Sequence, residues 1–292
     1  MAKFTGLWHG VAVADFDGDG KPDIAVSNAG RNTAYELYPL TVRLFYGDAN
    51  GDGMMQLAEA FADTKTKQWK PIRTLKVYAE TFPHIQGTIT RNKTFAGASL
   101  PQIIVPAFGG MKSLEITSLS SAVFLNKTGH FEMRPLPDAS QLAPAFDLCA
   151  EDLDDDGAVD LFLAQNAFGV PERTSRYDSG RGLLLRGDGT GNFAAVPASG
   201  SGIALYGEQR GVTAADFNND GRADLAVGQR GAATRLFINR KTDRGRCEVF
   251  GEKTQAVPLQ WDEPGTVVVV IGRRNVLNLF LRLRNRLKKA EK

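Results

Sequence analysis

The chain has 292 residues, of which 42% are apolar and 23% charged, a composition that indicates a soluble globular protein and excludes a disordered one. Its net charge of +2 divides unevenly: residues 265–292 hold eight basic residues and one acid, or +7, which leaves −5 for residues 1–264. Two cysteines, Cys149 and Cys247, are too few for a disulfide scaffold. The first residues lack the apolar run of a signal peptide, and no stretch approaches the roughly 20 apolar residues of a membrane helix.

The first predicted element is a hairpin around an acidic loop. Residues 11–14 and 24–26 are short apolar runs that predict strands, and Asp15-Phe-Asp-Gly-Asp-Gly-Lys-Pro-Asp23 lies between them. The carboxylates at positions 1, 3, 5 and 9 of this loop can turn inward around one hard cation, which takes about six to eight oxygens. Glycine at position 6 permits a turn with positive φ. The spacing predicts a calcium site.

The same frame, D-x-[DN]-x-D-G-x-x-D between two apolar runs, occurs three times, beginning at Asp15, Asp152 and Asp216. Three copies in one chain indicate a repeat architecture. Carboxylates crowded into one turn repel one another, and a cation removes that repulsion. The predicted Ca²⁺ ligands are Asp15, Asp17, Asp19 and Asp23, then Asp152, Asp154, Asp156 and Asp160, then Asp216, Asn218, Asp220 and Asp224. Candidates for a further oxygen are the carbonyls of Lys21, Val159 (or Ala158) and Arg222 (or Ala223).

A fourth, degenerate copy begins at residue 48, with Gln56 at the ninth position. It also fits an EF-hand loop with Glu59 at position 12. An EF-hand needs an entering helix, whereas residues 41–46 alternate and are rich in β-formers, so we interpret the copy as another turn of the repeat. Its weaker candidate ligands are Asp48, Asn50, Asp52 and Glu59.

A second repeating unit is a plain hairpin. Residues 122–131 and 183–193 each show an apolar strand, a turn of Gly, Asn or Asp, and an aromatic residue that starts the return strand. Residues 235–239 resemble the first half of a third copy. A calcium hairpin and a plain hairpin give four antiparallel strands, which is one propeller blade. The tripeptide Arg186-Gly187-Asp188 spells an integrin-binding sequence, but its position at a hairpin turn favours turn chemistry.

Two regions depart from the repeat. Between residues 70 and 106, apolar residues at helix-like intervals predict a helical insertion on the propeller rim. Residues 246–292 form an atypical basic extension, in which 257–261 and 266–271 predict strands. Residues 275–287 fit either an amphipathic basic helix or an alternating strand. We expect an all-β fold, a propeller or partial propeller of about four or five blades over residues 1–245.

The acidic hairpins resemble FG-GAP/VCBS repeats, which also form the heads of integrin α-chains. From Gly6 to about Asn239 the chain most resembles bacterial VCBS-repeat proteins of the ASPIC/UnbV-associated type. The segments that carry the closer resemblance are Ala14–Gly20, Asn28–Asn32, Phe45–Asp48, Arg134–Pro137, Gln141–Pro144 and Arg176–Gly182. The chain begins just before a calcium loop and its tail departs from the expected downstream domain, as in a C-terminal segment or a truncated reading frame.

The resemblance implies a Ca²⁺-binding β-propeller, usually exported or on the cell surface, that binds other molecules. We expect a non-catalytic adhesion module that is extracellular, periplasmic or at the cell surface, with a protein or carbohydrate ligand on the propeller face or the insertion. We expect no nucleic-acid partner. An alternative is a carbohydrate- or ester-processing enzyme with its site at the central channel, for which the sequence shows no cluster of His, Arg or acids outside the calcium loops. A third hypothesis is a segment that completes its ring with another chain.

Overall fold

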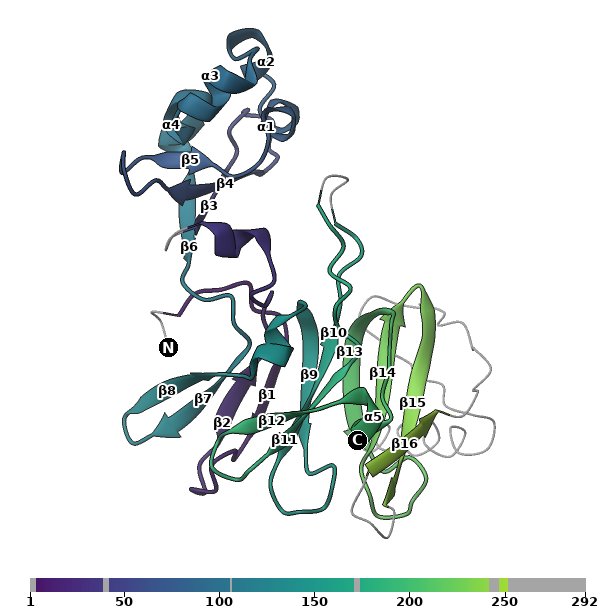
Figure 1. Ribbon diagram of the computed structural model, residues 1–292. Helices are drawn as coiled ribbons and strands as arrows, with labels where there is room; N and C mark the ends of the chain where they lie inside the picture. The colour runs from purple at the N-terminus through teal and green to yellow at the C-terminus, as the bar shows by residue number, and fades with distance from the viewer. Residues whose placement is uncertain (1–3, 39–41, 106, 171–173, 242–246, 252–292) are drawn as a thin grey trace, which may run out of the picture.

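A computed structural model describes residues 4–38, 42–105, 107–170, 174–241 and 247–251 (Figure 1). These residues form four antiparallel sheets of four strands each, together with several short helices. The expected fold class, mostly β with a small helical region, is confirmed.

Three of the sheets have the strand order of a propeller blade, in which each strand pairs with the next strand that the chain contributes to the same blade. Blade 1 contains β1 (Val11–Ala14), β2 (Asp23–Val26), β7 (Ala122–Lys127) and β8 (His130–Pro135). Blade 2 contains β9 (Ala145–Glu151), β10 (Asp160–Gln165), β11 (Leu183–Gly187) and β12 (Phe193–Val196). Blade 3 contains β13 (Glu208–Ala215), β14 (Asp224–Arg230), β15 (Ala232–Lys241) and β16 (Cys247–Gly251).

Each predicted hairpin has its place in this order. An acidic loop joins the first and second strands of every blade, and a plain turn joins the third and fourth strands of blades 1 and 2. In blade 3 the half hairpin at 235–239 belongs to β15, which pairs with β16. The third blade therefore continues past residue 245.

The blades stack face to face, with β1, β9 and β13 next to one another (Figure 1). Side chains alternate along a strand, so each blade has two faces, and both must be covered because one blade cannot bury them alone. The cluster between blades 1 and 2 includes Ala25, Val123, Leu125, Leu148, Leu161 and Leu185. The cluster between blades 2 and 3 includes Phe162, Leu184, Leu225, Val227 and Phe237.

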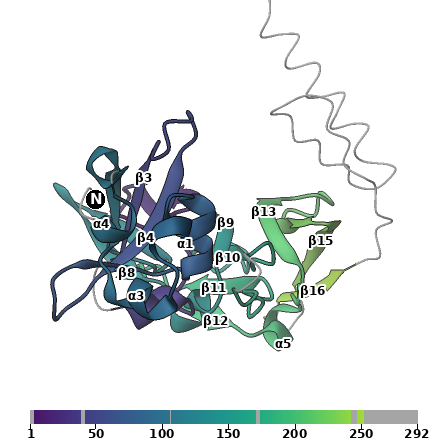
Figure 2. The same cartoon turned by 90° about the horizontal axis from the view of Figure 1, so that it is seen from above.

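Residues 27–121 interrupt blade 1 between its second and third strands and contain the fourth sheet. Its order is β5-β4-β3-β6, built from β3 (Val42–Gly47), β4 (Gln56–Ala62), β5 (Trp69–Pro71) and β6 (Lys112–Ile116). Figure 1 shows this sheet and its helices beyond one end of the blades, and Figure 2 shows them grouped together from above. The loop at residue 48, expected to continue the blade series, instead joins β3 to β4 here, because the sequence pattern shows a hairpin but not the sheet it enters.

The helical residues between 70 and 106 pack on this inserted sheet. They form α1 (Leu75–Thr81), α2 (Ile85–Thr88), α3 (Asn92–Gly97) and α4 (Leu100–Ile103). Prolines and glycines at the ends of these helices divide the predicted helical stretch into short pieces. Tyr78, Phe82, Phe95, Leu100 and Ile103 are buried against Phe45, Ala58 and Ala60 of the sheet. The remaining short helices are η1 (Ala34–Leu37), η2 (Ala107–Gly110), η3 (Asp138–Gln141) and α5 (Ala198–Ser201).

The longest helix among the described residues has seven residues, and none there has the length and apolar character needed to span a membrane. The strands predicted at 257–261 and 266–271, and the element predicted at 275–287, lie outside the described residues.

Candidate metal centres

The acidic loops of the three blades share one backbone geometry, organised by the aspartate at position 1. In the first loop, Asp15 Oδ1 accepts hydrogen bonds from the N–H groups of Gly18 (2.8 Å) and Asp19 (3.2 Å), and its Oδ2 accepts one from Gly20 N–H (2.8 Å). Asp152 and Asp216 accept the same bonds from the N–H groups at positions 5 and 6 of their own loops. The position-1 aspartate therefore closes each loop.

Positive φ angles at positions 4 and 6 explain part of the motif. Position 6 is Gly20, Gly157 or Gly221, with φ between 81° and 90°. Position 4 is glycine in the first loop but Asp155 in the second and Asn219 in the third, also with positive φ. Among residues with a side chain, Asn and Asp adopt this conformation most readily. The loop sequence thus follows from backbone sterics as well as from ligand chemistry.

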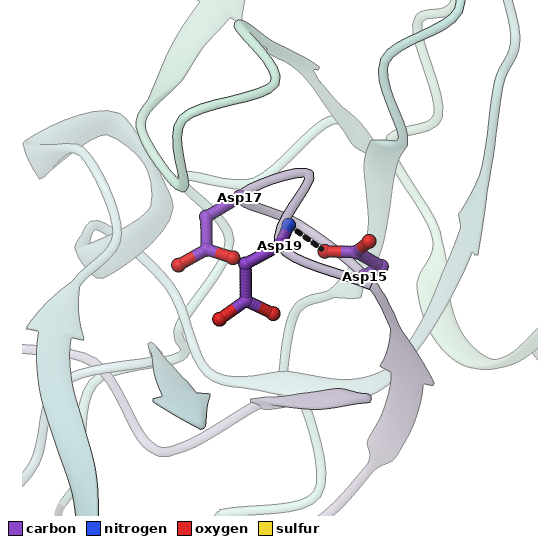
Figure 3. Close-up of side chains that lie close together, drawn as sticks. All are labelled: Asp15, Asp17 and Asp19. Carbon is purple, nitrogen blue, oxygen red and sulfur yellow. Dashed lines mark hydrogen bonds between the residues drawn. The ribbon is translucent and has the colours of Figure 1, made fainter. Parts of the chain in front are cut away.

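The closed loops bring the carboxylates of positions 1, 3 and 5 together. Carboxylate oxygens of Asp15, Asp17 and Asp19 lie within 4.8 Å of one another (Figure 3), and so do those of Asp152, Asp154 and Asp156. Oxygen-only donor sets of this kind suit Ca²⁺. Both triads were predicted as ligand groups.

The position-3 aspartates show most clearly that these loops fit a cation. The side chain of Asp17 is only 6% exposed; its Oδ2 pairs with Lys127, while its Oδ1 is buried without a hydrogen-bond partner. Asp154 repeats this arrangement, with Oδ2 at 2.6 Å from Arg186 Nη2 and Oδ1 buried and unpartnered. A buried anionic oxygen without a partner is costly. The residues of both loops therefore fit Ca²⁺, which would be held by the three carboxylates.

The ninth-position aspartates have a structural role that the sequence did not reveal. Asp160 is 1% exposed, and its two oxygens accept hydrogen bonds from the N–H groups of Leu153 (3.1 Å) and Gly187 (2.9 Å). Asp23 and Asp224 make the equivalent pairs of bonds, to Phe16 and Asn126 and to Phe217 and Asn239. Each therefore ties its acidic loop to the third strand of the same blade, and none belongs to a carboxylate triad.

The third and fourth loops depart from the first two. In the third, Asp220 Oδ2 accepts a hydrogen bond from Asn218 Nδ2 (2.9 Å) and pairs with Arg222. In the fourth, Asp48 accepts the same loop-closing bonds as Asp15. Gln56 Oε1 accepts a hydrogen bond from the N–H group of Ala49 (2.6 Å), the residue at position 2 of this loop. The ninth-position aspartates accept the equivalent bond from position 2 of their own loops.

The structure does not bring Glu59 to the fourth loop. Its carboxylate pairs with Arg73 and accepts a hydrogen bond from Tyr35 Oη (2.6 Å). Asn50 and Asp52 remain in the loop, where Asp52 Oδ1 accepts a bond from Met54 N–H (2.8 Å). Only Asp48, Asn50 and Asp52 of the four weaker candidates therefore share one loop.

Burial affects the acid–base properties of the second and third loops. Loss of solvent raises the pKa of Asp160 to about 6, against the two N–H bonds that favour the ionised form, and it also raises the pKa values of Asp154 and Asp224. Without Ca²⁺, folded Asp160 holds its proton to higher pH than the unfolded chain does, so this contribution stabilises the fold at low pH and is lost as pH rises through about 6.

We therefore expect the effect of Ca²⁺ on stability to depend on pH in the opposite sense. Ca²⁺ binds ionised carboxylates, so the rise in melting temperature on adding Ca²⁺ should shrink as the pH falls from 7.5 to 5.5. Melting curves with Ca²⁺ and with EDTA at pH 7.5, 6.5 and 5.5 measure this. An equal rise at all three values would contradict the protonation of loop carboxylates.

The structure also shows a charged cluster at the innermost strands. Arg210 Cζ lies 3.5 Å from the ring centroid of Phe146, and the ring centroids of His9 and Phe146 lie 4.6 Å apart. Arg210 and Arg230 both pair with Glu208, which is 4% exposed. Burial lowers the pKa of His9. The sequence did not reveal this cluster, because its members other than Glu208 and Arg210 come from distant segments.

The Arg186-Gly187-Asp188 tripeptide is held within its turn. Arg186 pairs with Asp154, Gly187 is buried, and Asp188 Oδ1 accepts hydrogen bonds from the backbone and hydroxyl of Thr190. The three residues therefore serve the hairpin, as turn chemistry predicts.

Comparison with known families gives two matches. Residues 7–38 and 210–245 match the FG-GAP repeat, and residues 152–227 match the FG-GAP-like repeat. The loop at residue 48 lies outside these segments. No curated protein matches the chain. The matched segments contain all three acidic loops of the blades, so the chain is a protein with FG-GAP and FG-GAP-like repeats.

Proposed function

We propose that the chain is a calcium-stabilised, non-catalytic binding module that works outside the cell or at its surface. The observation that supports it best is the pair of buried, unpartnered oxygens, Asp17 Oδ1 and Asp154 Oδ1, each in a carboxylate triad. In each blade the same loop is tied to the third strand through Asp23, Asp160 or Asp224. An ion there fastens a hairpin to its blade.

The exposed loops support a location where calcium is abundant. Asp17, Asp19 and Asp154 already pair with Lys127, Lys21 and Arg186, and these cations compete with Ca²⁺. Extracellular calcium modules bind with Kd values of about 0.1–1 mM. We expect values in this range by calorimetry. Sub-micromolar binding would instead support an intracellular sensor or buffer.

Removing the competing cation should strengthen binding at the first loop. Lys127→Met leaves the Asp17 carboxylate without its partner, so we expect Ca²⁺ affinity to rise about 2- to 5-fold, the range of a surface ion pair. Calcium titration calorimetry measures it. Lys93→Met, at an exposed position on α3, is the matched control and should leave the affinity unchanged. Equal affinity in both variants would show that Lys127 does not compete for the site.

The end of the blades opposite the acidic loops is the better candidate for ligand binding. A blade's strands alternate in direction, so the connections from second to third strands, and from one blade to the next, leave from that end. These connections include the inserted sheet and Tyr206, which is 66% exposed with Arg181 Cζ 5.0 Å from its ring centroid. Aromatic residues and arginine dominate binding hot spots.

Segments that carry the closer resemblance to the ASPIC/UnbV-associated proteins lie at the same end of the blades. Three of the segments that carry it meet there: Asn28–Asn32, Gln141–Pro144 and Arg176–Gly182. The N–H groups of Arg31 and Asn32 donate to the Gln141 carbonyl (2.8 and 3.1 Å), and Asn32 Nδ2 lies 3.5 Å from Ser179 Oγ. Their meeting links blades 1 and 2 near the candidate ligand face.

Retention and turnover assays separate binding from catalysis. The calcium-loaded chain is passed over chitin, cellulose, alginate and immobilised fibronectin, and is also incubated with soluble glycans and p-nitrophenyl esters. We expect retention on at least one matrix, lost in EDTA and reduced in Arg181→Ala/Tyr206→Ala but not in Thr128→Ala, a site exposed in the turn between β7 and β8 at the acidic-loop end. Release of reducing sugar or p-nitrophenol by the chain would support the enzyme alternative, with its site at the charged cluster of His9, Glu208 and Arg210.

A further inference from the structure

The two interfaces between blades bury the same positions. We call the face that a blade turns toward the preceding blade its leading face. In blade 2 this face includes Leu148 and Leu161, both buried against blade 1. In blade 3 it includes Leu225, Val227 and Phe237, buried against blade 2. Both blades that follow another blade therefore have an apolar leading face.

Blade 1 has an apolar leading face that no described blade covers. Val11 stands four residues before its acidic loop, as Leu148 does, yet Val11 is 63% exposed and Leu148 only 3%. Val13, two residues later on the same face, is 60% exposed. The N-terminal residues Phe4 and Trp8 contact Phe124, farther out on this sheet, and leave the β1 strip open.

Blade 3 presents the complementary half of the interface, its trailing face. In blades 1 and 2 the apolar residue at loop position 2, Phe16 or Leu153, is buried in the cluster shared with the next blade. Its equivalent in blade 3, Phe217, is only half-buried. Thr213 and Ala215 on β13 are exposed as well. Both ends of the array are thus halves of an interface that the chain already uses twice.

A hydrogen bond also crosses each of the two internal interfaces. At each end of the array of blades, one partner of this bond is present without the other. The carbonyl of Phe16 accepts a bond from Gly191 N–H of the next blade (2.8 Å), and that of Leu153 accepts one from Asn239 Nδ2 (2.7 Å). Among the described residues, no donor meets the carbonyl of Phe217. The open ends therefore lack the bond that both internal interfaces make.

The matching donor stands on blade 1. Asn126 and Asn239 are equivalent, since each donates its N–H to the ninth-position aspartate. Each also donates Nδ2 to the carbonyl just before that aspartate, at 3.2 Å. Asn239 gives a second bond to the preceding blade, whereas Asn126 makes no such bond within the described part of the chain. The leading face of blade 1 thus offers the donor that the trailing face of blade 3 lacks.

We propose that a second copy of this chain covers both open faces. The leading face of blade 1 in each copy meets the trailing face of blade 3 in the other, so the contact forms twice around a two-fold axis. Two arrays of three blades then close a six-bladed ring, within the range of about 4–8 blades of closed propellers. The three blades formed by the described residues are too few to close on themselves, which favours a second copy over self-closure.

Light scattering of the full-length chain in calcium tests the proposal. We expect twice the monomer mass, and Val11→Glu/Val13→Glu should return the monomer, because charges buried between apolar faces are costly. Both sites are exposed in one copy, so the variant should keep its circular dichroism spectrum. The control Leu57→Glu/Leu114→Glu changes residues of similar exposure, 53% and 56%, on the inserted sheet, and should remain a dimer.

A second variant tests the pairing of unlike faces. Thr213→Glu/Ala215→Glu should also give monomers, and mixing it with Val11→Glu/Val13→Glu should restore a weak dimer, because one intact interface remains. A monomeric wild-type chain, as would follow if residues 252–292 covered the faces, would overturn the proposal. So would an open polymer, or a dimer that survives either pair of substitutions.

Discussion

Asp160→Ala is expected to lower the free energy of unfolding by about 2–6 kcal/mol. The substitution removes the acceptor of two buried N–H groups, those of Leu153 and Gly187, and each unsatisfied group costs about 1–3 kcal/mol. It also separates the second acidic loop from β11. Urea denaturation in EDTA measures this loss apart from any loss of Ca²⁺.

The control for this variant lies five residues earlier in the same loop. Asp155 is exposed and belongs to neither the carboxylate triad nor the strand contact, but its φ of 56° favours Asp, Asn or Gly. Asp155→Asn keeps that preference and should change stability by less than about 0.5 kcal/mol. Equal effects of Asp160→Ala and Asp155→Asn would contradict the strand-tying role of the ninth-position aspartate.

Gly187→Ala is expected to destabilise the protein by about 3 kcal/mol, the upper part of the usual range for overpacking. A Cβ built at Gly187 would lie 2.2 Å from the Val159 carbonyl oxygen, a contact that only backbone movement can relieve. Such movement would also disturb the bond from Gly187 N–H to Asp160. Thermal and urea denaturation measure the change.

Gly109→Ala is the matched control, because a Cβ there meets nothing within 4 Å and the residue has no positive φ. It should be neutral or slightly stabilising. If Gly187→Ala were equally well tolerated, that result would contradict the close contact between β11 and the acidic hairpin. The pair also tests whether the central residue of the Arg-Gly-Asp tripeptide is required by packing.

Much of the blade structure was predictable because it follows from local rules. The frame beginning at Asp15 identifies a strand, a tight loop and a strand, since glycine or Asx residues are needed at its positive-φ positions. The plain hairpins at 122 and 183 follow from turn residues in the same way. The apolar spacing from Leu75 to Ile89 indicated helix, and prolines and glycines determined the division into short helices.

What the sequence did not reveal depends on contacts between distant segments. Nothing near Asp48 shows that its hairpin enters a separate sheet, because that depends on β6, far along the chain, pairing with β3. The second role of Asp23, Asp160 and Asp224 depends on backbone N–H groups of strands distant in sequence. Glu59 counted as a ligand by spacing, but Arg73 and Tyr35 hold its carboxylate in the structure.

Together these contacts give each acidic loop two structural roles. Each loop closes the first hairpin of its blade, and its position-2 residue packs into the next blade in two of the three cases. An ion bound in the loop would therefore stabilise both the blade and the contact between blades. This coupling predicts that calcium acts mainly on stability and assembly, while the opposite end of the blades remains available for ligands.

Thermal melting of the full-length chain in 5 mM CaCl₂ and in EDTA tests the calcium assignment most directly. With Kd values of about 0.3 mM, the two carboxylate triads would add about 3 kcal/mol at this concentration. For a chain of this size that corresponds to a rise in melting temperature of about 7–14 °C. MgCl₂ should produce a much smaller rise, because Mg²⁺ dehydrates reluctantly and demands near-octahedral geometry. A melting temperature that is the same in calcium and in EDTA would contradict the account.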